Sequence, residues 1–542
     1  MNKKLTTVLV LAIVLGTLLA PLPSQAQGNE GVLYVTVPSP AAVETLVAGG
    51  LDVWHVDVVN GQYLVTVWAD PSDPRLAGYP VTVDEERTQV YRDAPNQVGV
   101  TGVTGQGFLG GYLTPSEMAT HMQNLANAHP GEASVFDYGD SWDKATAGGP
   151  AGFDLQGIHI GPAGRHNLVV LCGVHAREIV PKEICRLFAE WLLSTEADAA
   201  YIRQLGVDIL WDNNPDGSQI VATTGQLWRK NTRTNCGDAS KRGTDLDRNR
   251  SGTWGGPGGS TDPCNETYRG AAATSEPESS GFESWLATYF TQVARNPRTQ
   301  PFPSTTPTMI LNLHAYGKQT LMVWGDNTQT PNHAQLLQIC NRFGQLMGYA
   351  CTFPYPSYAV SGTSDDHFYW NYGAAFTWEI GVDFFEPYSN LPTRWNETRP
   401  GLVQAAKLSP MPMSLIYGPE PTNVFVAPAM VNTNTIVSAF ATVSDSQNGN
   451  QAIAEAQLFV DTPPEFGGTP IAMSATDGAF DETTEQVTGS FSTTGLPAGY
   501  HLVMVRARDA ASNWGTISAA WLIRVEGEIS SYYLPIVLKN NP

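Results

Sequence analysis

The sequence predicts three folded parts in series: a small α+β unit, a central α/β body built on a mixed twisted sheet with flanking helices, and a β-sandwich. The chain has 542 residues, enough for two to four domains. Between residues 31 and 86, short strand and helix patterns alternate around one tight turn. From there to about residue 418, apolar strand-like runs alternate with helical stretches, as in α/β proteins. After "GPEPTN" only short strands separated by turn residues remain, which favours a sandwich.

Residues 1–26 have the pattern of a signal peptide. Lys3 and Lys4 form a basic start, "LTTVLVLAIVLGTLLA" is an apolar segment, and "SQA" is a small-residue cleavage site. The apolar run is short, so a cleaved leader is favoured over a membrane anchor, and no later segment is apolar enough to span a membrane. We therefore expect an exported protein, secreted or held at the cell surface, in which six cysteines can form three disulfides.

Residues 27–95 are assigned to a ferredoxin-like unit with the order β-α-β-β-α-β. "GVLYVTVP" predicts a strand and "AAVETLVAGG" a short helix. Two further strands flank Asn60-Gly61, the strongest short hairpin signal. "DPSDPRLAG" predicts a helix or turn, and "YPVTVDEE" predicts the last strand. The stretch 87–107 is interpreted as a polar, glycine-rich linker.

The α/β body is assigned to residues 105–418. A capping box at Thr114 to Glu117, with proline at the first helical position, predicts the start of a helix. The runs "HNLVVLCGV", "VDILWDNN", "TMILNLHAY", "QTLMVWG" and "AAFTWEIG" predict strands, and helical stretches separate them. This alternation indicates a parallel or mixed sheet.

Residues 420–527 predict an immunoglobulin-like β-sandwich, and "LPAGYHLVMVRARDAASNWG" resembles a late hairpin of such a module. The tail 528–542 is apolar but too short to span a membrane. An added strand and a sorting signal both remain open for it.

The net charge of −21 argues against nucleic-acid binding, which needs a clustered cationic face. It favours a well-solvated surface.

One metal-binding pattern stands out in "LCGVHAREIVPKEIC". His175 and Glu178 follow an apolar strand run, and open α/β sheets place ligand sites at such strand ends. Catalytic zinc needs three nitrogen or oxygen ligands and an open position, and His314 at the end of "MILNLH" can be the third. A second His-x-x-Glu, from His129 to Glu132, lies where Pro-Gly ends a helix and is predicted to be a loop.

Nine blocks in order resemble the zinc metallocarboxypeptidases of the pancreatic carboxypeptidase A/B and bacterial carboxypeptidase T type. The resemblance covers about residues 105–418. The blocks are "CGVHAREIVPKEIC", "NNPDG", "LWRKNTR", "GTDLDRNR", "PCNETYRG", "SEPES", "NLHAYGK", "SGTSDDHFYWNYG" and "FTWEIG".

This resemblance implies a catalytic centre. It assigns His175, Glu178 and His314 as the ligands of one zinc ion, which acidifies water and polarises the scissile carbonyl. Glu379 of "FTWEIG" matches the general base. Arg229 of "LWRKN" matches the arginine that stabilises the oxyanion.

The resemblance also implies a substrate site for peptide C-termini. Arg248 matches the arginine that binds the terminal carboxylate through a two-pronged fork. Tyr358 matches the tyrosine that closes over that carboxylate. Arg177 and Tyr316 are assigned to substrate binding further along the site, although Arg177 could equally be a surface arginine.

Two acidic positions distinguish this chain. Asp365 of "SGTSDDHF" falls at the base of the pocket for the departing side chain, where a carboxylate favours Lys or Arg. Dual specificity stays open, as does an Asp365 turned away beside a structural Asp366. Asp247 stands where the family has Asn, and an ionised Asp cannot donate to a carboxylate. Asp247 either pairs with a cation or is protonated when the substrate binds. The third option is that the substrate does not end in a simple α-carboxylate.

The resemblance further implies three disulfides and argues against thiolate zinc ligands. The expected pairs are Cys172–Cys185, Cys236–Cys264 and, by elimination, Cys340–Cys351.

We expect a monomeric, secreted zinc carboxypeptidase that removes C-terminal Lys or Arg. Residues 27–95 occupy the place of an inhibitory pro-domain, so a zymogen cleaved near Arg87 or Arg92 is expected, with an accessory module as the alternative. Calcium binding stays open because no oxygen-ligand loop of clear spacing is present. The alternatives in function are a hydrolase of cell-wall or γ-linked peptides and a catalytically weak surface-binding protein.

Overall fold

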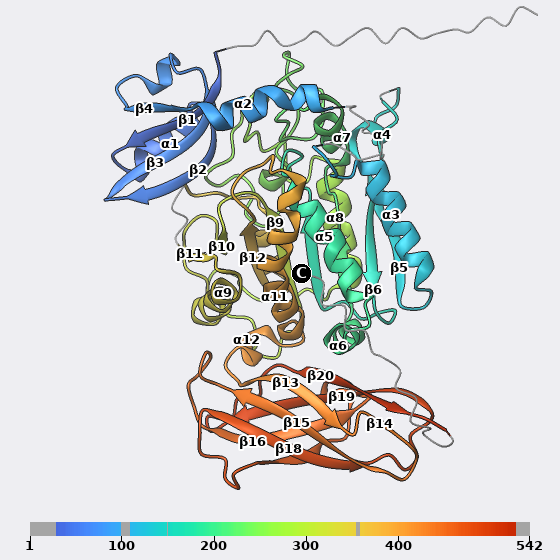
Figure 1. Cartoon of the computed structure of the whole chain (residues 1–542). Helices are drawn as coiled ribbons and strands as arrows, with labels where there is room; N and C mark the ends of the chain where they lie inside the picture. Colours follow the sequence, from blue (N-terminus) through green and yellow to red (C-terminus); the bar gives the residue numbers. More distant parts are fainter. Residues whose placement is uncertain (1–28, 99–108, 149, 354–357, 527–542) are drawn as a thin grey trace, which may run out of the picture.

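The computed structural model describes residues 29–98, 109–148, 150–353 and 358–526 (Figure 1). The expected signal peptide and C-terminal tail lie outside these residues. The N-terminal sheet, the central body and the C-terminal strands follow one another along the molecule, with the central body in the middle (Figure 1).

The N-terminal part is a four-stranded antiparallel sheet in the order β2-β3-β1-β4. The hairpin turn at Asn60 and Gly61 has φ values of 51° and 77°, as the Asn-Gly signal predicts. The segment "DPSDPRLAG", predicted to be a helix or turn, contains a short 3₁₀ turn. The elements are β1 Gly31–Val37, α1 Pro40–Ala48, β2 Asp52–Val59, β3 Gln62–Ala69, η1 Pro74–Leu76 and β4 Val81–Asp84.

The linker prediction is wrong for the residues that directly follow this sheet. They form helix α2 (Glu85–Asp93) and the 3₁₀ turn η2 (Ala94–Gln97). Thr88 accepts a hydrogen bond from the backbone of Val32 at 2.9 Å, and Tyr91 is buried. The helix therefore buries only a narrow face, which a pattern of mostly polar residues does not reveal.

The central sheet has eight strands in the order β11-β10-β12-β9-β7-β8-β6-β5 and is mixed, as predicted. The strands β8, β7, β9 and β12 run parallel, and their mostly apolar runs are buried because helices cover both faces. The bounds are β5 Ala133–Asp140, β6 Asp154–Ile160, β7 Leu168–Cys172, β8 Val207–Leu210, β9 Met309–His314, β10 Gln319–Met322, β11 Ala350–Thr352 and β12 Ala374–Glu379.

Helices flank this sheet, and α5, α11 and α9 pack side by side (Figure 1). The first helix, α3, starts with the predicted capping box between Thr114 and Glu117. The helices are α3 Pro115–Ala128, α4 Trp142–Ala145, α5 Ile179–Leu192, α6 Ala197–Leu205, α7 Pro215–Thr224, η3 Leu246–Arg248, α8 Pro277–Tyr289, α9 His333–Met347, α10 Ser364–Asn371, η4 Tyr388–Asn390, α11 Leu391–Leu408 and α12 Pro412–Leu415.

The C-terminal part contains eight strands that enclose a separate apolar core. Their hydrogen-bonded order is β13-β15-β18-β17-β16-β19-β20-β14. The elements are β13 Glu420–Ala427, β14 Met430–Val431, β15 Ile436–Ser444, β16 Ile453–Val460, η5 Pro464–Phe466, β17 Ile471–Ala475, β18 Thr484–Ser492, β19 Gly499–Asp509 and β20 Ser518–Arg524.

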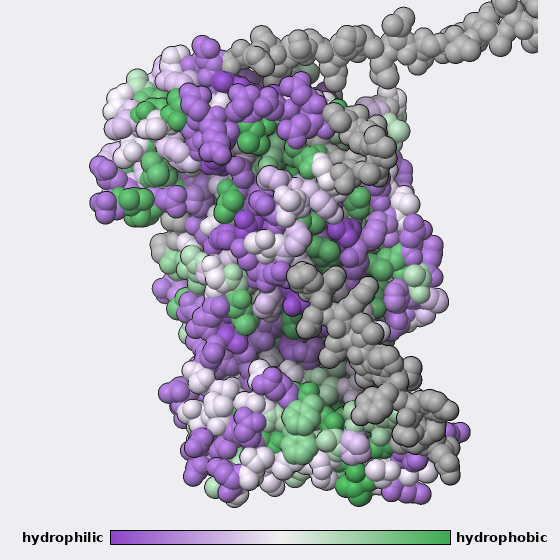
Figure 2. Space-filling view, in the orientation of Figure 1, coloured by the Kyte–Doolittle hydropathy of each residue, from purple (hydrophilic) through white to green (hydrophobic). Residues whose placement is uncertain are grey.

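Three disulfides join the expected pairs: Cys172–Cys185, Cys236–Cys264 and Cys340–Cys351. Among the residues that the structure describes, no helix is both long and apolar enough to cross a bilayer. The face seen in Figure 2 is largely hydrophilic, in agreement with the solvated surface that the net charge predicts.

Candidate active site

The ends of three parallel strands bring the candidate catalytic residues together. Strand β9 ends at His314 and β12 ends at Glu379, and these two residues are paired in register. Strand β7 lies on the other side of β9, and His175 follows it in the turn before α5. The carboxyl ends of neighbouring parallel strands meet at one sheet edge, where open α/β sheets bind ligands.

The predicted metal ligands converge on one point. The Nδ1 atoms of His175 and His314 are 3.1 Å apart. The two carboxylate oxygens of Glu178 lie 2.8 Å from Nδ1 of His175 and 2.9 Å from Nδ1 of His314. Ligand atoms around tetrahedral zinc are about 3.3 Å apart, so this buried N₂O set fits zinc.

The electrostatics of the set favour a cation. Burial opposes a charge on His314, but Glu178 raises the pKa of His314 to about 9. A site that raises the pKa of a buried imidazole in this way has a negative potential, which also attracts a metal ion.

An outer carboxylate, Asp245, orients one ligand. Its Oδ1 lies 3.1 Å from Nε2 of His175, the nitrogen that does not face the other ligands. Its Oδ2 accepts hydrogen bonds from the guanidinium of Arg229 at 2.9 and 3.2 Å. Burial opposes ionisation, but Arg229 and His175 hold the pKa of Asp245 well below its usual value. Such carboxylates fix the tautomer of a metal-binding histidine, and sequence reasoning gave Asp245 no role in the site.

One cavity with about 700 Å³ of open space contains almost all of the predicted site. Tyr316 is the exception: it does not line the cavity, and its ring packs against Arg87 and Phe384. The predicted residues that line the cavity are His175, Arg177, Glu178, Arg229, Asp247, Arg248, His314, Tyr358, Asp365 and Glu379.

Glu379 faces this cavity from the end of β12. Burial raises the pKa of Glu379 to about 8, since nearby cations only partly offset the loss of solvent. A metal ion held by the ligand set would lower that pKa again. Arg229 brings its guanidinium within 3.9 Å of Glu178, so a fixed cation borders the metal position.

Arg248 is held by backbone carbonyls. Its Nε donates to the carbonyl of Gly258 at 3.1 Å, and its Nη1 donates to the carbonyl of Asp247 at 2.8 Å. The hydroxyl of Tyr358 lies 3.5 Å from its Nη2. Because carbonyls carry no full charge, the cation keeps its capacity to bind an anionic group.

Asp247 faces two cations. Its Oδ1 accepts hydrogen bonds from the backbone and hydroxyl of Ser364, both at 3.0 Å. Its Oδ2 lies 3.7 Å from Nε2 of His314 and 3.9 Å from Nη1 of Arg248. Burial opposes ionisation, but these charges and that of His175 lower the pKa of Asp247, so the carboxylate is ionised.

Asp365 and Asp366 differ in their environment. Asp366 accepts hydrogen bonds from Thr253 and from the backbone of Gly325. Asp365 is fully buried and lines the cavity, and its oxygens accept no well-aligned hydrogen bond from the described residues. Burial, followed by the charge of Asp247, raises the pKa of Asp365. Asp365 is therefore the acidic group that a cationic side chain in the cavity would meet.

The N-terminal sheet covers the open side of the cavity. Val53, Trp54 and His55 of β2 contribute to its lining. Asp52 forms two hydrogen bonds with Arg177, which is only 1% exposed. Arg177 is thus neither a surface residue nor open to solvent.

The second His-x-x-Glu lies outside this site. His129 caps the end of α3, and its Nδ1 is 3.4 Å from the partly exposed carboxylate of Glu132. This agrees with the predicted loop.

Comparisons with known proteins agree with this geometry. The zinc carboxypeptidase family model matches residues 118–401. A metallocarboxypeptidase A-like protein of Trichophyton verrucosum is 34% identical over 170 residues, 30% of this chain and 38% of the relative. Carboxypeptidase B of Bos taurus is 29% identical over 241 residues, 41% of this chain and 54% of the relative.

Solved structures show the same fold. A carboxypeptidase A from Helicoverpa armigera matches with a TM-score of 0.58 and 20% identity, covering 70% of this chain and 98% of that one. Thrombin activatable fibrinolysis inhibitor matches with a TM-score of 0.55 and 18% identity, covering 70% and 99%. In sequence, the chain spans about half the length of the curated relatives that it matches.

Proposed function

The chain belongs to the zinc carboxypeptidase family, and from this we propose that it is an exported enzyme that hydrolyses the C-terminal peptide bond of peptides and proteins. One observation carries the proposal: a metal ligand set, a buried carboxylate and two arginines line the same cavity. The ligand set, the carboxylate and both arginines each have a role in this reaction, and surface binding alone does not require them together.

Each catalytic residue has a separate role in the proposed reaction. A zinc ion held by His175, Glu178 and His314 would polarise the scissile carbonyl and acidify water. Glu379 takes a proton from the attacking water and gives it to the leaving amine. Arg229, fixed by its ion pair with Asp245, faces the oxyanion that develops.

Arg248 is proposed to hold the C-terminal carboxylate of the substrate. Its guanidinium is oriented by two carbonyls and keeps free donor capacity toward the cavity. Tyr358 lies beside it and closes over the bound carboxylate. A free C-terminus is thereby required for binding.

The departing residue is proposed to be Lys or Arg. Asp365 lines the cavity as a buried carboxylate with no strong partner among the described residues, and a cation would relieve its cost of burial. An apolar side chain would leave that cost in place, so it binds less well.

The N-terminal unit is proposed to be a ferredoxin-like inhibitory pro-domain. Its strand order fits that fold, and Asp52 of its strand β2 occupies Arg177. Cleavage near Arg87 or Arg92 would need local unwinding, because both lie in α2, and Arg87 is also paired with Asp383. Removal of the unit would open the cavity.

The C-terminal strands are proposed to form an immunoglobulin-like sandwich that serves attachment or substrate proximity. Three disulfides support an extracellular location. A monomer is proposed.

The proposal is tested with purified, processed enzyme and three substrates: hippuryl-Arg, hippuryl-Lys and hippuryl-Phe, each with and without a metal chelator. We expect release of the basic residues that the chelator stops and zinc restores. Glu379→Gln should lower kcat about a thousandfold while zinc binding persists. If the wild type releases none of the three residues, the carboxypeptidase proposal fails.

A further inference from the structure

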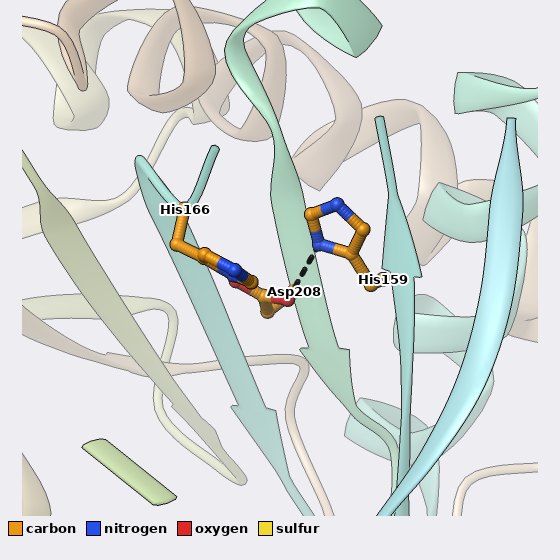
Figure 3. Close-up of side chains that lie close together, drawn as sticks. All are labelled: His159, His166 and Asp208. Carbon is orange, nitrogen blue, oxygen red and sulfur yellow. Dashed lines mark hydrogen bonds and ion pairs between the residues drawn. The ribbon is translucent and has the colours of Figure 1, made fainter. Parts of the chain in front are cut away.

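A second cluster of side chains of the types that bind metals lies at the end of the central strands opposite to the candidate active site. His159 of β6 and Asp208 of β8 are directly paired across the two strands. His166 lies in the loop that leads into β7. The cluster therefore sits at the amino ends of β7 and β8, whereas the catalytic residues follow the carboxyl ends of parallel strands. Figure 3 shows the carboxylate of Asp208 between the two imidazole rings.

Both imidazoles point Nδ1 at the same carboxylate. Nδ1 of His159 is 2.9 Å from Oδ1 of Asp208, and Nδ1 of His166 is 2.8 Å from Oδ2. Asp208 is completely buried, His159 is buried and His166 is half-buried. No function assigned above uses these three residues.

The contact of Nε2 of His159 shows which ring nitrogen carries the proton in the neutral imidazole. Nε2 lies 3.2 Å from the carbonyl of Pro162, so this nitrogen carries a proton and donates it. In the neutral ring, Nδ1 is then a bare lone pair that faces a carboxylate oxygen. Two acceptors at 2.9 Å repel one another, so a cation must lie between them, either a proton or a metal ion.

The geometry of the cluster favours a metal ion over a proton. The centres of the two rings are 4.7 Å apart, and both rings point Nδ1 at the carboxylate of Asp208. One divalent ion can satisfy both nitrogens and the carboxylate at once.

We propose that His159, His166 and Asp208 form a second metal site that binds Zn²⁺ or a similar first-row divalent ion. Two imidazole nitrogens with one carboxylate are a zinc-type donor set, whereas calcium prefers oxygen ligands alone. The hydrogen bond from His159 to Pro162 matches the outer contact that metal-binding histidines make. His166 is 10% exposed and gives the ion an entry path.

The site would stabilise the contact between the central body and the C-terminal strands. The loop that carries His166 also carries Arg165, whose guanidinium lies over the ring of Phe466 at 3.4 Å from its centre. Fixing His166 to β8 through a metal holds this loop in place. The ion is therefore structural, and it is far from the chemistry because the whole length of the strands separates the two edges.

The test is zinc stoichiometry of the full chain. Metal-free protein, prepared with a chelator and no reductant, is loaded with zinc and desalted, and its zinc content and Tm are measured. We expect two zinc ions per wild-type chain and one in His166→Asn. Asn keeps a donor in the place of Nδ1 but is a poor zinc ligand, so a site held only by hydrogen bonds would tolerate it.

Two further variants make the result decisive. His121→Gln changes another histidine paired with a carboxylate, Glu190, and should leave two ions. His314→Ala removes the proposed catalytic zinc, and zinc should still raise the Tm of this variant by several degrees. Zinc should not raise the Tm of the double variant His166→Asn/His314→Ala. If the wild type binds one ion and only His314→Ala abolishes its binding, the second site does not exist. If the wild type binds one ion and only His166→Asn abolishes its binding, the second site is supported and the catalytic zinc is contradicted.

Discussion

Two hydrogen bonds of 2.5 and 2.9 Å join the guanidinium of Arg177 to the carboxylate of Asp52, 125 residues earlier in the chain. The rings of Trp54 and Phe384 lie against the same guanidinium, at 5.6 and 4.5 Å from its centre. This arginine, which lines the cavity, is thus held by the N-terminal sheet and by Phe384 of the central body. The covering sheet and a bound substrate cannot both use Arg177.

Breaking this pair should activate the unprocessed chain. In Asp52→Asn the bidentate, charged contact is lost, so the N-terminal sheet should release the cavity more often. We expect hydrolysis of hippuryl-Arg by the uncleaved protein to rise at least about tenfold. The control is Asp57→Asn, which removes a half-exposed carboxylate of the same strand that pairs with His55. Equal activity of the two variants would show that inhibition does not depend on Asp52.

Replacing Asp365 should change the preferred C-terminal residue. Asp365→Asn removes the charge that a Lys or Arg side chain would meet, while the volume of the pocket stays the same. We expect kcat/KM for hippuryl-Arg to fall about a hundredfold, and that for hippuryl-Phe to stay the same or rise. The Phe substrate is the internal control for intact catalysis. A parallel loss for both substrates would mean that Asp365 supports the fold and does not select the substrate.

Replacing Asp247 should strengthen substrate binding. Asn can keep an oxygen toward Ser364 and turn its amide toward the cavity, where the Oδ2 of Asp247 now faces Arg248. The amide donates to a carboxylate that the charged oxygen repels. We expect the KM of Asp247→Asn for hippuryl-Arg to fall about tenfold with kcat little changed. An unchanged KM would indicate that His314 and Arg248 already neutralise Asp247.

The parts of the site that follow from local pattern could be predicted from the sequence. His175, His314 and Glu379 each stand at or just after the end of an apolar strand, and parallel strands bring such ends to one edge. Resemblance supplied the arginines and two of the disulfide pairs, and elimination supplied the third. The mixed sheet followed from the alternation of strand and helix patterns.

What was missed depends on contacts between distant segments. Nothing around Asp52 indicates that it will meet Arg177. The pairing of β6 with β8 places His159 opposite Asp208, and this register is not encoded near either residue. The composition of α2 is that of a linker, because the helix is stabilised by Thr88 and Tyr91, which pack on the sheet, and not by its own residue types.

A buried carboxylate away from the site should make stability fall with rising pH. Glu278 is completely buried, and it shares the amide of Asn231 with Glu276. Burial, together with the charge of Glu276, raises the pKa of Glu278 to about 8. Its ordinary value is 4.5. Between these values the folded chain binds a proton that the unfolded chain has lost.

The contribution of Glu278 is therefore full below pH 4.5 and lost as pH rises to about 8, by at most about 1.4 kcal/mol per pH unit. We expect the free energy of unfolding of the wild type to fall between pH 5 and pH 8 by clearly more than that of Glu278→Gln, which cannot ionise. Denaturant unfolding at pH 5, 6.5 and 8 measures this difference, with the exposed Glu44→Gln as the matched control. Curves that stay parallel for wild type and Glu278→Gln would mean that Glu278 ionises normally in the folded chain.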